Sequence, residues 1–292
     1  MKFFLFLIFS VWVYQLNAQN PACYKIYNAS GKEVSFEDMV KASSTSDMVF
    51  FGEFHNDPIA HWFELLLTEK LFVLTGNKLI LGAEMFESDN QLIFDEYQKG
   101  LIPAKKFEEE ARVWPNYSTD YKPIVEYAIT NKIPFIATNT PRRYASIVSS
   151  SGLDGLLNLS DDAKKLIAPL PIKYDENLNC YKSMLQMGGM SGMKGGKTDP
   201  SNFPKAQAIK DATMAHFIMT NYQPGKLLLH FNGSFHSDNH EGIVWHLKQA
   251  KNDLKITVIS TVNQKDISKL EEEYLNQGDF ILCVPENMTK TN

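Results

Sequence analysis

Short apolar runs alternate with longer amphipathic segments along most of this chain, and this alternation limits the folds that it can adopt. The apolar runs predict strands at residues 48–52, 79–83, 133–137, 226–231, 255–259 and 280–284. Apolar residues at helical spacing predict helices over residues 59–74, 91–99, 121–131, 143–149, 206–221 and 242–251. Strands that alternate with helices are joined by crossovers, which make neighbouring strands parallel. The sequence therefore predicts an α/β fold with a mostly parallel sheet flanked by helices.

Three stretches depart from this alternation. Residues 24–36 alternate around a central turn and predict an edge hairpin, while residues 101–120 and 160–205 predict helical or irregular insertions. The second insertion contains a Met- and Gly-rich segment, residues 183–198, in which glycine is too dense for a stable helix. We expect a mobile loop there, whose methionines close over the mouth of a ligand cleft. A soft-metal site at the sulfurs, or a loop without a role, are the alternatives.

The N-terminus has the pattern of a secretory signal peptide. Lys2 precedes an apolar core at residues 3–13, and Ala18 supplies a small residue at the expected cleavage point. This core is too short to span a bilayer. We expect residues 1–18 to be removed, leaving a single α/β domain over residues 19–292. The protein would then be exported and be periplasmic, outer-membrane-associated or extracellular.

Composition excludes several classes of protein. The chain has 292 residues, of which 44% are hydrophobic, and its formal net charge is −5. This is a globular composition, and it lacks the basic excess of a nucleic-acid-binding protein. Three cysteines are too few for a disulfide scaffold, and their spacings match no zinc motif. A lipid anchor at Cys23 is a weaker prediction than simple cleavage, because Asn20 and Pro21 do not suit it.

Polar side chains follow directly after four of the predicted strands. These segments are Gly52–Pro58, Glu84–Glu87, Asn139–Arg143 and Asn232–His236. The carboxyl ends of parallel strands meet at one edge of a sheet, which is where ligands bind in such folds. We therefore expect one site at this edge.

The pattern Gly-x-Phe-His occurs twice, at Gly52–His55 and Gly233–His236. Two imidazoles and the carboxylate of Glu84 form a set that binds a divalent metal. The same residues suit metal-free acid–base chemistry, in which a histidine activates water and a glutamate orients it. Arg142 suits a carboxylate ligand or an oxyanion. We expect His55, Glu84, Arg142 and His236 to converge, with Glu53 and His61 nearby as ligand-binding residues.

Tyr117 and Tyr121 lie beside Trp114 and before a predicted helix. A phenolate binds ferric haem, which makes both tyrosines candidate ligand-binding residues. The methionines of residues 183–198 carry thioethers, which also ligate haem iron or Cu(I). Aromatic packing is the alternative for each tyrosine.

Taken together, these motifs resemble the ChaN-like haem-binding proteins, within a superfamily that includes Tiki-type metalloproteases and erythromycin esterases. The matching segments run from residue 50 to residue 246, most of the chain that would remain after cleavage. They are Gly52–Pro58 with His61, Gly82–Phe86 with Gln91 and Asp95, Trp114 with Tyr121–Pro123, Ile133–Pro134 with Asn139–Arg142, Gln207–Ala215 and Gly233–His236.

The resemblance implies an exported protein of haem or iron uptake, in which a tyrosine holds haem and two molecules pair around stacked haems. Tyr117 and Tyr121 are the candidates for that tyrosine. The superfamily's histidines, glutamate and arginine map onto His55, His236, Glu84 and Arg142. In the Tiki branch such residues act with a metal, and in the esterase branch they hydrolyse a substrate. A haem site, a hydrolase site with or without a divalent metal, or both in one cleft therefore remain as interpretations. The family's lipid anchor implies peripheral membrane attachment, but the signal at Cys23 is poor.

Overall fold

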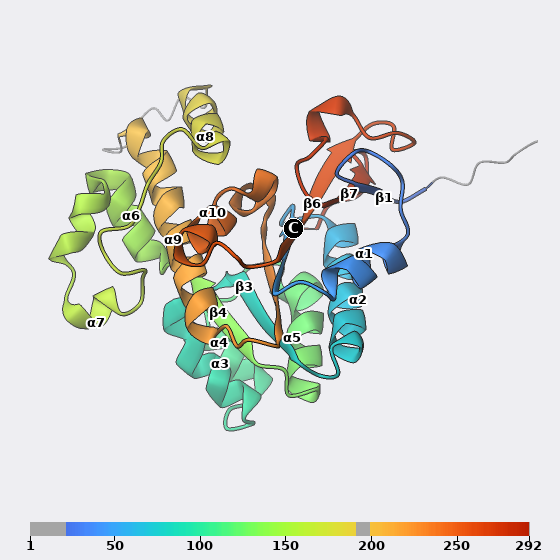
Figure 1. Cartoon of the computed structure of the whole chain (residues 1–292). Coiled ribbons are helices and arrows are strands. Elements are labelled where there is room, and N and C mark those ends of the chain that lie inside the picture. The colour runs from blue at the N-terminus through green and yellow to red at the C-terminus, as the bar shows by residue number, and fades with distance from the viewer. Residues whose placement is uncertain (1–21, 191–198, 292) are drawn as a thin grey trace, which may run out of the picture.

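A seven-stranded sheet runs through the centre of the molecule, with helices packed on both of its faces (Figure 1). The computed structural model describes residues 22–190 and 199–291. The strand order is β1-β7-β6-β2-β5-β3-β4, and all neighbours are parallel except β1 and β7. The strands are β1 (Lys25–Asn28), β2 (Met48–Glu53), β3 (Leu79–Glu87), β4 (Phe135–Asn139), β5 (Leu227–Gly233), β6 (Ile256–Gln264) and β7 (Phe280–Pro285). The predicted α/β fold is confirmed.

α-Helices connect the strands from β1 to β6, whereas the crossover from β6 to the parallel strand β7 contains a 3-10 turn at Glu272–Tyr274. All six helices that the sequence predicted begin within three residues of their expected start. The α-helices are α1 (Phe36–Ser43), α2 (Pro58–Leu74), α3 (Gln91–Gln98), α4 (Ala104–Glu110), α5 (Lys122–Thr130), α6 (Arg142–Ser151), α7 (Asp161–Lys164), α8 (Asn179–Met190), α9 (Phe203–Asn221) and α10 (Ile243–Ala250).

Successive residues of β2 face opposite sides of the sheet and build two hydrophobic cores. Val49 and Phe51 pack into the larger core, together with residues of α2 and α5. Met48 and Phe50 pack into the core formed with α9 and α10. All four side chains are fully buried, as expected for a central parallel strand. A sheet covered on both faces leaves its two edges and the strand ends as places for a ligand.

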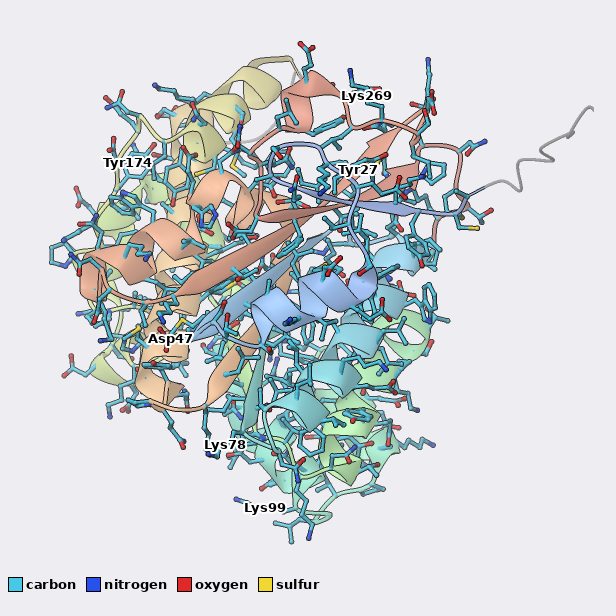
Figure 2. All side chains as sticks on the ribbon, turned by 45° about the vertical axis from the view of Figure 1, so that its right-hand side comes forward. Tyr27, Asp47, Lys78, Lys99, Tyr174 and Lys269 are labelled. Atoms are coloured by element: carbon cyan, nitrogen blue, oxygen red, sulfur yellow. The ribbon has the colours of Figure 1, made fainter. Side chains whose placement is uncertain are left out.

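The amino and carboxyl ends of the strands lie in different surroundings. Asp47 and Lys78 immediately precede β2 and β3, and they mark the amino ends of these strands (Figure 2). The carboxyl ends lead into short loops with polar side chains.

At the C-terminal end of the chain, the backbone N–H of Thr291 donates to the carbonyl of Asn56, 3.0 Å away. The last described residues therefore pack against the loop after β2.

The predicted edge hairpin is only partly formed. β1 pairs antiparallel with β7, and the returning segment contributes a single bridge between Tyr27 and Glu33. The chain then enters α1, whose first turn is capped by a reciprocal pair of hydrogen bonds between Ser35 and Asp38. Capping at Ser35 ends the extended segment before a second strand can develop.

The two predicted insertions are helical and irregular. Residues 101–120 contain α4 and the start of a π-helical turn at Tyr117–Tyr121, and residues 160–205 contain α7 and α8. The loop predicted over residues 183–198 is wrong for its first part, because α8 continues to Met190 despite Gly188 and Gly189. Residues 191–198 lie outside the described part of the chain. Among the described residues, no helix is both long and apolar enough to cross a membrane.

Candidate functional site at the carboxyl edge of the sheet

The carboxyl ends of β2 and β5 lie side by side and position the site. Their register aligns Glu53, the last residue of β2, with Gly233, the last residue of β5. Each strand is followed by the Phe-His half of a repeated motif, which brings His55 and His236 to the same edge. Asp57 then caps α2 by accepting hydrogen bonds from the backbone N–H groups of Ile59 and Ala60.

A cavity of about 320 Å³ opens between these strand ends. Its lining combines carboxylates, imidazoles, an ammonium group and apolar side chains. The residues are Glu53, Phe54, His55, Glu84, Met184, Gln207, Lys210, Gly233, Ser234, Phe235 and His236. The structure thus brings together His55, Glu84, His236 and Glu53. We call this the histidine cavity.

Three polar side chains surround the carboxylate of Glu53, which lines the cavity. Its Oε1 lies 2.6 Å from Nδ1 of His55 and accepts a hydrogen bond of 2.8 Å from the Tyr121 hydroxyl. Its Oε2 lies 2.8 Å from Nε2 of His61. Burial disfavours the carboxylate, but hydrogen bonds from His55 and His61 outweigh burial and bring the pKa of Glu53 down to about 2. Glu53 is therefore a buried anion that orients both imidazoles.

His55 is the partly open member of this group, with 40% of its side chain exposed. Burial lowers its pKa, but the carboxylates of Glu53 and Glu84 outweigh burial and raise it. The imidazole packs edge-on against Trp114, with ring centroids 4.7 Å apart. A carboxylate on one nitrogen and an open side toward the cavity are what a general base or a ligand of iron requires.

A second layer of buried acids lies behind Glu53, and the sequence analysis did not identify it. Asp120 lies 3.2 Å from Nδ1 of His61 and accepts hydrogen bonds from Asn116 and Thr291. Glu64 is fully buried on α2, and both of its oxygens lack hydrogen-bond partners among the described residues. Burial and the neighbouring Glu53 raise the pKa of Glu64 well above its usual range. Glu64 is therefore a neutral acid, which leaves Glu53 as the anion.

His236 lies between two carboxylates on the other side of the cavity. Its Nε2 is 3.1 Å from Glu84, and its Nδ1 contacts Asp211. Burial favours the neutral ring, but Glu84 and Asp211 outweigh burial and raise the pKa of His236 to about 9. Burial also opposes charge on Glu84, yet the two histidines hold its pKa well below the usual range. This side of the cavity therefore contains a buried imidazolium at neutral pH.

Two further hydrogen bonds fix this arrangement. The backbone N–H of Gly233 donates to Glu84 over 2.8 Å, and the Tyr181 hydroxyl donates to Asp211 over 2.9 Å. The sequence analysis assigned no role to Asp211 or Glu64. The signal that identifies them is a carboxylate at an inward position of an otherwise apolar helix face, because an acid is buried there only with partners.

The structure places Arg142 apart from this cavity, which corrects the expectation that it joins the histidines. Its Nε donates to Glu87 over 2.6 Å, and 69% of its side chain is exposed. Glu87 also pairs with Arg112, and Asp89 pairs with both Arg112 and Arg143. The β3 strand is irregular between Ala83 and Glu87. Glu84 and Glu87 consequently serve different clusters.

Tyr117 and Tyr121 do not reach the cavity surface, which corrects their assignment as ligand-binding residues. Tyr117 is buried in the larger core against Phe86 and Phe107, and its hydroxyl has no partner among the described residues. Tyr121 donates to Glu53. Burial is the main cause that raises the pKa of both phenols. Neither phenol is placed to become a phenolate ligand in this conformation.

The assignment of His55, Glu84 and His236 as divalent-metal ligands applies only if a metal is used, and it stays a prediction. Within residues 22–190 and 199–291, no group of three or more His, Cys, Asp or Glu side chains is arranged to hold a metal ion. Both ring nitrogens of His236 face carboxylates, so each N–H of the ring has a hydrogen-bond acceptor, Glu84 or Asp211.

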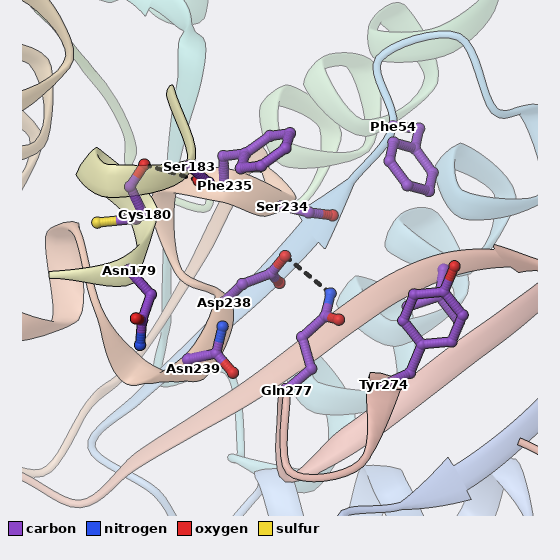
Figure 3. A pocket seen from close by; sticks show the side chains of 11 residues that line it. Phe54, Asn179, Cys180, Ser183, Ser234, Phe235, Asp238, Asn239, Tyr274 and Gln277 are labelled. Atoms are coloured by element: carbon purple, nitrogen blue, oxygen red, sulfur yellow. Dashed lines mark hydrogen bonds between the residues drawn. The ribbon is translucent and has the colours of Figure 1, made fainter. Parts of the chain in front are cut away.

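A second cavity, of about 310 Å³, adjoins the first and shares Phe54, Ser234 and Phe235 with it. Figure 3 shows the rings of Phe54, Phe235 and Tyr274 around the carboxylate of Asp238 and the amide of Gln277. Burial raises the pKa of Asp238 to about 7, although hydrogen bonds from Ser260 and Gln277 oppose that shift. We call this the amide pocket.

Fold and site together define an α/β protein with a cavity of paired histidines and carboxylates at the carboxyl edge of a parallel sheet. The chain belongs to the family described as haem-binding uptake, Tiki superfamily, ChaN, whose model matches residues 39–247. The predicted resemblance is therefore confirmed.

Two solved structures are similar to this chain to different degrees. One, described as cofacial heme binding to ChaN of Campylobacter jejuni, is 20% identical with a TM-score of 0.66, covering 89% of this chain and 96% of that one. The type III effector HopBA1 is 13% identical with a TM-score of 0.46, covering 85% and 92%. At 20% identity the likeness to the first of these structures is one of fold. No curated protein matches the chain significantly.

Proposed function

We propose that this protein binds haem at the histidine cavity and acts in haem or iron uptake after export. The observation that carries this proposal is membership of a haem-binding uptake family over residues 39–247. The signal-peptide pattern of residues 1–18 supports export, with cleavage after Ala18 and a periplasmic, outer-membrane-associated or extracellular location. The intact mass of the mature protein tests export: retention of Met1, or a lipid on Cys23, contradicts simple cleavage.

The donor groups of the cavity fit a haem. His55 offers an imidazole, and Glu53 holds the Nδ1 atom of that ring. The side chains of Phe54 and Phe235 offer apolar faces at the mouth, and Lys210 offers a cation for a propionate. The volume of about 320 Å³ is at the lower end of the range for ligand pockets. We infer that a macrocycle lies across the mouth, where a second copy of the chain would cover its outer face.

Tyr274 lines the amide pocket. No other tyrosine among the described residues lines that pocket or the histidine cavity. Burial and the acidic neighbours Glu273 and Glu271 raise the pKa of Tyr274, which opposes a phenolate. We therefore assign the iron-facing position to His55. His55, with its ring fixed by Glu53, would hold the haem, which would supply the iron.

A haem titration followed by absorbance tests the proposal. We expect a shifted Soret band that is lost in His55→Ala and retained in Tyr121→Phe. Circular dichroism of each variant controls for folding, and Phe203→Ala on the exposed start of α9 serves as a remote control. Loss of the band in Tyr121→Phe with His55→Ala unaffected would overturn the assignment, and no shift in the intact protein would overturn haem binding itself.

A hydrolase using the same cavity is the second candidate, and one observation favours it. His55 is an open imidazole held by a carboxylate, and the buried imidazolium of His236 lies on the same cavity. The first arrangement suits a general base. Both N–H groups of His236 are held by Glu84 and Asp211, so the cation that suits stabilisation of an oxyanion is Lys210 on the same cavity. Hydrolysis of p-nitrophenyl acetate, lost in His55→Ala and in Lys210→Gln, would support this function. A rate equal in both variants and the intact protein would exclude these residues.

A further inference from the structure

The amide pocket differs chemically from the histidine cavity that it adjoins. Its lining, taken over the described residues, includes no lysine or arginine. It instead presents the side chains of Asn179, Asn239 and Gln277 beside the carboxylate of Asp238. A pocket without a cation disfavours a phosphate or a carboxylate ligand, whose recognition relies on charge-assisted hydrogen bonds. Its hydrogen-bonding groups suit an uncharged ligand with many donors and acceptors.

The polar wall of this pocket is fixed by its own hydrogen bonds. Asp238 accepts from Ser260 over 2.7 Å and from the Gln277 amide over 2.8 Å. Asn239 has a φ of 58°, and its backbone N–H donates to the Gln277 carbonyl over 2.7 Å. Asparagine tolerates this left-handed conformation, and Asn239 is exposed where it lines the pocket. Its side-chain amide forms no hydrogen bond with the described part of the chain, which leaves its donors and acceptor for a ligand.

Aromatic rings form the opposite wall. Phe235 is 45% exposed although it lies between two buried residues, Ser234 and His236. Phe54 is half-buried across the pocket, and Tyr274 closes its side (Figure 3). The pocket therefore has an exposed aromatic face beside rigid amide and carboxylate groups. A pyranose ring is complementary to both, because it has a C–H face and a rim of hydroxyl groups.

We propose that the amide pocket binds one unit of a neutral saccharide, stacked on Phe235 and hydrogen-bonded by Asn239, Gln277 and Asp238. Phe54, Ser234 and Phe235 also line the histidine cavity, so a longer oligosaccharide extends from the pocket over His55. The polar residues that bind this ligand do not line the histidine cavity, whereas Phe54 and Phe235 line both, so a bound haem and a bound saccharide compete for these two rings.

Isothermal titration calorimetry with maltotriose and with triacetylchitotriose tests the proposal. We expect the intact chain to bind at least one of the two. Asn239→Gly keeps the backbone conformation and removes the amide, and we expect binding about fivefold weaker, as for one net hydrogen bond. Phe235→Ala should weaken binding about tenfold through loss of the aromatic face.

Two matched variants control for folding and for loss of surface area. Asn77→Gly removes an exposed asparagine at a φ of 65°, and Phe203→Ala removes a phenylalanine that is 48% exposed. We expect both controls to bind the saccharide as the intact chain does, and Asn239→Gly to keep its haem titration unchanged. Binding of neither probe, or equal losses in the controls, overturns the proposal. A Soret band lost in Tyr274→Phe also overturns it, because the pocket would then hold haem.

Discussion

The imidazole of His55 occupies the space beside Gly233 that a side chain at residue 233 would need. A Cβ atom on Gly233 would stand 2.8 Å from Nε2 of His55 and 3.5 Å from Oε2 of Glu84. Real Cβ atoms do not approach a ring atom to 2.8 Å, so one of the two groups must move. Glycine at the end of β5 is therefore a condition for placing His55 beside Glu84.

This contact predicts the effect of Gly233→Ala. The added methyl group should displace His55, lower the free energy of unfolding by about 1–3 kcal/mol and weaken haem binding. In a His55→Ala background the same substitution should cost less, because the obstructing ring is gone. Urea unfolding of both single variants and the double variant measures the coupling. Equal costs in the two backgrounds would show that the ring is not what the methyl group meets.

The position of His236 predicts a loss of stability in mildly alkaline solution. Its folded-state pKa of about 9 exceeds the ordinary value of 6.5, so the folded state holds its proton more tightly. The resulting stabilisation is fully present below pH 6.5 and is lost as pH rises through 9. We expect the free energy of unfolding to fall by about 3 kcal/mol between these values. In His236→Gln the fall should largely disappear, and an unchanged slope would contradict the assignment.

The two buried tyrosines should respond differently to loss of the hydroxyl group. The Tyr117 hydroxyl lacks a partner among the described residues, so Tyr117→Phe should leave stability unchanged or raise it by about 1 kcal/mol. The Tyr121 hydroxyl donates to ionised Glu53, so Tyr121→Phe should cost about 1.5–3 kcal/mol. Guanidinium unfolding of the two variants, which remove the same atom, gives the comparison. A larger loss for Tyr117→Phe would reverse the interpretation.

Glu64 should tolerate an uncharged replacement of the same shape. Burial and the neighbouring Glu53 raise its pKa and favour the protonated form, so Glu64→Gln should change the free energy of unfolding by less than about 1 kcal/mol. Glu64→Ala should cost about 2–4 kcal/mol through the cavity that it leaves. The infrared band of a neutral carboxylic acid should be present in the intact protein and absent in Glu64→Gln. A carboxylate band lost instead would show that Glu64 is ionised.

Local sequence patterns were sufficient to predict the fold and the location of the site. Each central strand is buried on both faces and therefore forms a continuous apolar run, such as Val49 to Phe51. Parallel pairing then requires that strand ends meet at one edge. The repeated Gly-x-Phe-His segments lie at two such ends, so His55 and His236 could be expected to share a cavity before any side chain was placed.

Contacts between segments far apart in the chain decided the rest. Nothing local distinguishes Arg142, which turns to Glu87, from an arginine that faces the cavity, and nothing local shows that Tyr121 is buried against Glu53. Glu64 and Asp211 occupy inward positions of their helices, but the sequence of neither helix shows that Glu64 lies beside Glu53 or that Asp211 pairs with His236. The extension of α8 through Gly188 and Gly189 overrides their low helix propensity. Periodicity fixes which way a backbone segment faces, whereas the charge state and partner of a buried group depend on which distant residues enclose it.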